Sequence, residues 1–218
     1  DLDHDGRLDL ILCSSDYPDV PPYEERLRLF MQQADGTFSD RTLEIDIKLF
    51  GAGQPALADY DVDGDLDFAV SQSFNKIDEE RKRAAALANG TLTDPAGPIA
   101  EARPRYHVFL NEMTEGRGSI VLRLVGDPRQ GVASDALGAI VRLTADLDRD
   151  PATPAVTQMR QLIGIGGHGG KQHDFIVHFG LGEADIADRI TIEWPGIDVE
   201  DTVLENVAPG TVVVRLGK

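Results

Sequence analysis

The chain has 218 residues, with 38 acidic against 21 basic side chains and a formal net charge of −17. A field of this sign opposes binding to nucleic acid and to anionic membrane surfaces, so neither is expected as a partner. No apolar run approaches the roughly 18 residues of a membrane-spanning segment, and a single cysteine, Cys13, excludes an internal disulfide framework.

The chain begins with an aspartate-rich loop, residues 1–9, which has acids at positions 1, 3, 5 and 9 and Gly6 at the turn. Carboxylates at these positions can converge on one hard cation, and the main-chain carbonyl of Arg7 can add an oxygen. An EF-hand would need a glutamate at position 12, where this chain has Leu12. We therefore predict a calcium loop that leads directly into a strand, with the side-chain ligands Asp1, Asp3, Asp5 and Asp9.

Short alternating segments follow the first loop. Leu8–Ser14 is predicted to be a buried strand, and Arg26–Gln32 alternates polar and apolar residues with the period of a strand. Asp35 and Gly36 indicate a turn, and Thr42–Phe50 alternates loosely again. Several short strands between turn signals favour an all-β architecture.

The aspartate pattern recurs 58 residues later, in a second loop at residues 59–67 that runs into the apolar Phe68–Val70. Five aspartates in nine residues repel one another unless a divalent cation binds them, and calcium accepts six to eight oxygens at flexible geometry. The alternative is an Asp-Gly hairpin turn with solvated acids, which the matching repeat disfavours. The predicted ligands are the side chains of Asp59, Asp61, Asp63 and Asp67 and the main-chain carbonyl of Asp65.

Residues 75–104 depart from this pattern and are predicted to be an insertion. Ile77–Leu87 has high helix propensity and a stop signal at Asn89-Gly90, which predicts one short helix. Tyr106–Asn111 resumes a strand, and Gly116–Gly118 marks a domain boundary. We therefore predict a first domain at residues 1–118 and a second at residues 119–218.

The second domain has the pattern of a compact β-sandwich. Trp194, at the end of an apolar strand, is predicted to fill the core, with an exposed aromatic binding platform as the alternative. The predicted strands are Ile120–Val125, Leu137–Leu143, Met159–Ile165, Phe175–Phe179, Arg189–Trp194 and Thr211–Leu216.

Residues 1–74 resemble FG-GAP/VCBS repeats, on the two aspartate loops, Leu29-Phe30 and the motif Asp35–Phe38. That resemblance implies partial β-propeller blades with calcium in the blade loops. The second domain resembles the ASPIC/UnbV domain, on the motifs Val177–Gly182 and Ile192–Gly196 and the glycine-rich segment 164–170. Together they resemble the cartilage-acidic-protein-like family of large secreted proteins, which implies no enzymatic activity.

Three histidines, His168, His173 and His178, fall in one stretch and could hold a transition metal. The spacing of His173 and His178 along a strand places them on opposite faces, and His178 lies in an ASPIC/UnbV motif where a hydrogen bond is the expected role. A metal-dependent enzyme or redox subunit built on these histidines is therefore the alternative function. A carbohydrate-binding module is a further alternative.

The leading hypothesis is a secreted, calcium-binding, non-enzymatic interaction or scaffold protein of the adhesion type. The calcium ions would be structural, and the partner would be a protein or glycan on the extracellular side. The protein itself would be secreted and extracellular, with the periplasm or the cell surface as the alternatives. Because the chain starts at the first ligand of a motif, we expect it to be the C-terminal part of a longer protein.

Overall fold

The computed structural model describes residues 1–13, 27–42, 44–45, 53–72, 82, 84–91, 93, 105–164 and 173–217. The regular secondary structure of these residues is almost all β-strand, which confirms the predicted fold class. They form two compact units, the first of Asp1–Leu8, Ala56–Phe68 and Phe109–Lys218 and the second of Asp9–Pro55 and Ala69–Val108. The predicted domain boundary at residue 118 stays a prediction, because each compact unit combines segments from different parts of the chain.

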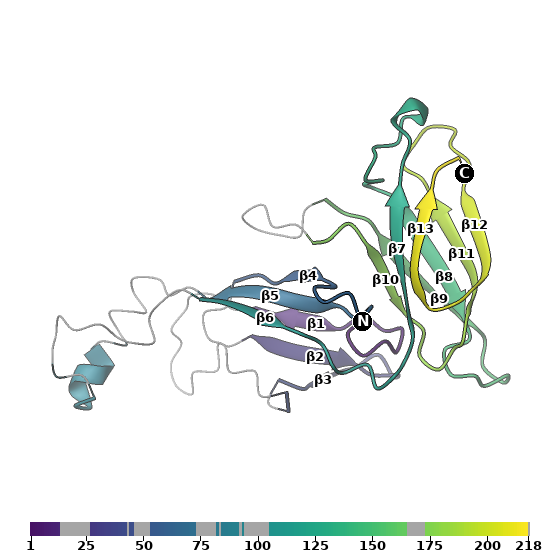
Figure 1. Ribbon diagram of the computed structural model, residues 1–218. Coiled ribbons are helices and arrows are strands. Elements are labelled where there is room, and N and C mark those ends of the chain that lie inside the picture. Colours follow the sequence, from purple (N-terminus) through teal and green to yellow (C-terminus); the bar gives the residue numbers. More distant parts are fainter. Residues whose placement is uncertain are drawn as a thin grey trace. The chain divides into compact units, whose positions relative to one another are not determined.

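An antiparallel three-stranded sheet follows the first loop, in the order β1 (Leu10–Leu12), β2 (Arg28–Gln32) and β3 (Phe38–Asp40) (Figure 1). The turn at Asp35-Gly36 joins β2 to β3, as predicted, and Gly36 donates its N–H to the Gln33 carbonyl at 2.9 Å. The strand predicted at residues 42–50 is wrong at residues 42, 44 and 45, which form a turn, and residues 46–50 lie outside the described residues. Asp40 accepts both the N–H and the hydroxyl of Thr42, which favours a turn over a continued strand.

A second three-stranded sheet has the order β4 (Ala56–Ala58), β5 (Asp67–Gln72) and β6 (Arg105–Phe109), and the second loop joins β4 to β5. The rings of Phe68 and Phe109 stack with centroids 4.7 Å apart, which fixes the start of β5 against the end of β6. Residues 82 and 84–88 are helical, as predicted, and the rest of the predicted insertion lies almost entirely outside the described residues. No helix in the described part of the chain has the length and apolar character to span a membrane.

The C-terminal residues form a sandwich of two sheets. One has the order β10 (Val177–Gly180), β7 (Ser119–Val125) and β13 (Gly210–Arg215), with β13 parallel to β7. The other has the order β12 (Thr202–Val207), β11 (Ala187–Glu193), β8 (Ile140–Ala145) and β9 (Val156–Gln161). Side chains of both sheets share one core, among them Ile120, Phe179, Leu143 and Ile190. This arrangement confirms the predicted sandwich.

The sandwich differs from the prediction at three strands. β8 begins at Ile140 rather than Leu137, and β9 ends at Gln161, within the predicted segment Met159–Ile165. β9 begins at Val156 rather than Met159, because the pairing of Ala145 with Val156 extends the β8–β9 ladder in that direction. β12 was not predicted, since its sequence TVLENV has few apolar residues and only pairing with β11 organises it as a strand. Trp194 is 5% exposed within the core and donates its indole N–H to the Thr202 hydroxyl at 2.9 Å, which confirms the predicted core role.

Replacing Phe179 by alanine tests the shared core of the sandwich. The ring is fully buried, so Phe179→Ala should lower the free energy of unfolding by about 3–5 kcal/mol through lost burial and a cavity. Val213→Ala, at a side chain that is 52% exposed on β13, should cost less than about 1 kcal/mol. Urea denaturation of both variants measures the difference, and equal losses would contradict the assignment of the core.

Candidate functional site

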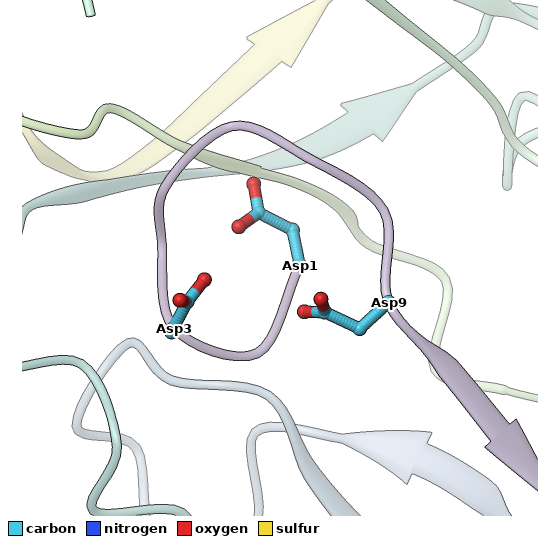
Figure 2. A group of neighbouring side chains, drawn as sticks. All are labelled: Asp1, Asp3 and Asp9. Carbon is cyan, nitrogen blue, oxygen red and sulfur yellow. The ribbon is translucent and has the colours of Figure 1, made fainter. Parts of the chain in front are cut away.

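The first loop gathers three of its predicted ligands. One carboxylate oxygen from each of Asp1, Asp3 and Asp9 lies within 4.8 Å of the other two. Figure 2 shows the loop closing around the three side chains, with their oxygens turned inward. Because a divalent cation needs oxygen ligands that converge from several directions, this geometry fits a cation better than an ordinary turn does.

The second loop gathers its aspartates at the same positions. Asp59, Asp61 and Asp67 each offer a carboxylate oxygen, and these oxygens also lie within 4.8 Å of one another. Positions 1, 3 and 9 therefore converge in both loops, which share their aspartates at positions 1, 3, 5 and 9, the glycine at position 6 and a leucine at position 8. The structure brings together six of the eight side chains predicted from the sequence.

The two loops have the same backbone path. Position 4 has a left-handed backbone in both, with φ of 60° at His4 and 66° at Val62. Position 6 is left-handed as well, with φ of 88° at Gly6 and 99° at Gly64, a region that glycine enters at little cost. The glycine N–H then donates to the position 1 carboxylate, at 3.3 Å to Asp1 and at 3.2 Å for the corresponding pair in the second loop.

The carboxylates at position 5 lie outside the two groups of three. Asp5 accepts the N–H of Arg7 at 2.8 Å and also pairs with its guanidinium group. Asp63 accepts the N–H of Asp65 at 2.9 Å in the same way. Both side chains thus support the turn from within the loop, and their role as ligands stays a prediction, as does that of the carbonyls of Arg7 and Asp65.

The carboxylate at position 9 is held by a neighbouring strand or segment in each loop. Asp9 accepts the N–H of Gln32, at the end of β2, at 3.0 Å. Asp67 accepts the N–H of Asn111 at 2.8 Å and that of Tyr60 at 2.7 Å. A position 9 ligand is therefore oriented by backbone donors that do not depend on a cation.

The electrostatics of the second loop favour a bound cation. Partial desolvation, followed by repulsion from Asp63 and Asp67, raises the pKa of Asp61. Desolvation also raises the pKa of Asp65, whereas the electrostatic interaction with the nearby His4 lowers it in part. Each of the gathered carboxylates disfavours the ionised form of the others, so a bound divalent cation would offset the repulsion between them.

Buried hydrogen bonds hold the first loop against the sandwich within the same compact unit. The Asp1 side chain is 1% exposed, and its carboxylate accepts the N–H of Gly180, at the end of β10, at 2.9 Å. The His4 carbonyl accepts the N–H of Gly182 at 2.7 Å. A Cβ at Gly180 would lie 2.4 Å from the His4 Cα, so the loop can approach this closely only because the strand ends in glycine.

The second loop is held by β7 and β10 of the sandwich. The Gly64 carbonyl accepts the hydroxyl of Ser119 at 2.8 Å and the Nε2–H of His178 at 3.0 Å. Burial, then the neighbouring His4, lowers the pKa of His178 to about 3, so this imidazole is neutral near pH 7. The hydrogen bond predicted for His178 is confirmed, and its partner is a loop that lies more than 100 residues earlier in the chain.

His173 has a separate structural contact. Its Nδ1 accepts the N–H of Leu57 at 3.0 Å, and the Leu57 carbonyl accepts the N–H of Asp174 at 3.1 Å. Among the residues that the structure describes, neither His173 nor His178 belongs to a group of three possible metal ligands, and His168 lies outside those residues. The sequence alone does not indicate His4 as a contact residue, because partners such as Asp65 and Gly182 lie far from it in the chain.

Two family models match the chain. Residues 1–70 match the FG-GAP-like repeat, and residues 130–215 match the model described as ASPIC and UnbV. Both of these domain families are generally non-catalytic, and FG-GAP repeats are typically extracellular or at the cell surface. A search of curated proteins found no match to this chain.

The close approach at Gly180 gives a test of how the first loop is held. Gly180→Ala should displace the loop, because the added Cβ meets the main chain of His4 rather than the end of a flexible side chain. We expect faster amide hydrogen exchange at residues 1–8 and a lower melting temperature. Gly164→Ala is the matched control, since the atoms nearest to its Cβ belong to the flexible Leu137 side chain, at 3.3 Å. Unchanged exchange in Gly180→Ala would contradict the packing described here.

The buried imidazole of His178 predicts a loss of stability in acid. The pKa of His178 is about 3 in the folded chain and ordinarily near 6.5, so the unfolded state binds the proton first as the pH falls. Stability from this group is present above pH 6.5 and is lost progressively as the pH drops toward 3. Between pH 7 and pH 5 the loss should be about 2 kcal/mol.

A matched variant isolates this contribution. His178→Gln keeps an N–H donor for the Gly64 carbonyl but does not titrate, so its unfolding free energy should fall less between pH 7 and pH 5 than that of the wild type. Urea denaturation at the two pH values measures both. Parallel pH profiles would show that His178 is not the titrating group.

Proposed function

Because the chain carries an FG-GAP-like repeat followed by an ASPIC/UnbV domain, we propose that it is a secreted calcium-binding protein that acts as a non-enzymatic scaffold of the adhesion type. The coarser role, extracellular interaction or scaffolding, follows from the character of the two domain families. The observation that carries the calcium proposal is the convergence of three carboxylates at the same positions in both loops.

Calcium suits the two loops better than other biological cations. All side-chain donors in the two groups are carboxylates, which are hard oxygen ligands, and neither group contains histidine or cysteine. Three carboxylates, supplemented by main-chain carbonyls and water, would supply the six to eight oxygens that calcium takes, whereas magnesium requires a tighter octahedral shell. The ions would be structural, since they would neutralise the acids that the turns bring together.

A structural role matches the places of the two loops in the fold. The first loop leads into β1, and the second loop joins β4 to β5, so each bound cation would fix the start of a strand. Extracellular modules with Kd of about 10⁻⁴–10⁻³ M are occupied where calcium is millimolar. The proposed partner is a protein or a glycan on the extracellular side, which the loop-rich surface would contact.

A thermal melt tests calcium binding directly. The melting temperature should be higher in 10 mM CaCl₂ than in excess EGTA, because a ligand that binds only the folded state stabilises it by mass action. At a calcium concentration about 100 times Kd, the gain should be about 2.7 kcal/mol for each site. Magnesium at the same concentration should give a smaller shift.

Two charge-neutralising variants make this test specific to the loops. Asp61→Asn removes one ligand of the second loop and should lose a large part of the calcium-dependent shift. Asp188→Asn removes the same charge from an exposed position at β11 and should keep the whole shift. Equal shifts in the two variants, or no shift in the wild type, would show that the loops are acidic turns without a cation.

A further inference from the structure

A single buried residue, Asn111, joins the two loops. Its main-chain N–H donates to the Asp67 carboxylate at 2.8 Å, and its side-chain amide donates to the Leu2 carbonyl at 2.7 Å. The side-chain oxygen of Asn111 accepts the N–H of Met113 at 3.0 Å, and the residue is only 8% exposed. A ligand of the second loop and the main chain of the first loop are therefore held by one residue, whose orientation its own neighbours fix.

A pair of buried histidines joins the loops a second time. The rings of His4 and His178 lie with centroids 4.8 Å apart, and their residues are 1% and 6% exposed. His178 donates to the Gly64 carbonyl in the second loop, and the Nε2 of His4 lies 3.4 Å from the carboxylate of Asp65. An imidazole from the first loop thus contacts both the sandwich and the second loop.

Arg117 extends this second connection to Asp3, one of the predicted cation ligands. The Arg117 carbonyl accepts the Nδ1–H of His4 at 3.1 Å. The Arg117 guanidinium donates to the Asp3 carbonyl at 3.1 Å. Asp3, which lies between Leu2 and His4 in the first loop, is thereby tied to the same contacts as the histidine pair.

These contacts point to coupling between the two cation sites. Each loop must gather like charges and hold a left-handed residue at position 4, so without a cation its bound geometry is unfavourable. We propose that the two loops bind calcium cooperatively, with Asn111 and the His4–His178 pair as the coupling residues. Binding in one loop orders contacts that the other loop also needs, so the second ion binds to a site that is already formed. This inference rests on the proposed function.

Calcium titration of the whole chain tests the coupling. Isothermal titration calorimetry of chelator-treated protein with CaCl₂ should show two ions bound with a Hill coefficient between about 1.3 and 2. Asp61→Asn, which disables the second loop, should weaken binding at the intact first loop by about 5- to 150-fold. If the two sites are independent, Asp61→Asn would leave the calcium affinity of the first loop unchanged.

A bridge variant removes two of these connections and leaves every aspartate in place. Asn111→Ala loses the donor to Leu2, and His178→Phe keeps a ring beside His4 but loses the donor to Gly64. In the double variant, two ions should still bind, with a Hill coefficient clearly below that of the wild type. Trp194→Phe is the matched control, because it also removes a buried ring N–H from the sandwich, and it should keep the cooperative titration.

The possible outcomes separate this inference from the proposed function. Two ions bound to the wild type with a Hill coefficient of about 1, and an unchanged first loop in Asp61→Asn, would overturn the coupling and leave calcium binding intact. No bound calcium in the wild type would overturn the proposed function itself. If near-ultraviolet circular dichroism shows that the bridge variant does not fold in excess CaCl₂, the comparison of wild type with Asp61→Asn decides the question.

Discussion

Repulsion between carboxylates is the constraint around which both loops are arranged. Three acids in each loop place oxygens within 4.8 Å of one another. This arrangement is unfavourable unless hydrogen bonds or a cation offset the repulsion between the carboxylates. Part of the answer is local, since the glycine N–H at position 6 donates to the position 1 carboxylate in both loops. Further donors come from β10 and from Asn111, both far away in the chain. A divalent cation would offset the repulsion between the carboxylates that remains.

Close backbone approach makes this arrangement possible. The first loop lies against the end of β10 at Gly180, where any side chain would overlap the main chain of His4. A Cβ at Gly182 would lie 2.4 Å from the Leu147 carbonyl oxygen, and one at Gly6 would lie 2.4 Å from the Leu147 side chain. The glycines of the loop and of the sandwich therefore serve the same contact, although the sequence gives no sign that they meet.

His173 and His178 make contacts that their spacing in the sequence does not indicate. Their proximity in sequence raises the hypothesis of a shared transition-metal site. In the structure His173 accepts the N–H of Leu57 and His178 donates to the carbonyl of Gly64, so each holds one end of the segment that runs from β4 through the second loop. Both imidazoles are thus used in positioning the loop that gathers aspartates, which links the C-terminal sandwich to the proposed calcium chemistry.

Local patterns predict much of this protein from its sequence. The alternation of residues predicts most strands of the sandwich. The aspartate and glycine spacing predicts two loops with carboxylates gathered from positions 1, 3, 5 and 9, and those at positions 1, 3 and 9 do converge. Both succeed because the interactions concerned lie within a few residues of one another. β12 was not predicted, since a strand with few apolar residues depends on its neighbour in the sheet.

Only the tertiary structure decides what surrounds the loops. The hydrogen bonds from Gly180 to Asp1, from Asn111 to Asp67 and from His178 to Gly64 join residues separated by 179, 44 and 114 positions. No local pattern carries such information, because these contacts depend on how the sandwich closes and on where glycine permits close approach. The sequence by itself determined that this chain gathers acids in two turns. The fold decided that the two turns share buried partners, and with that whether they can act together.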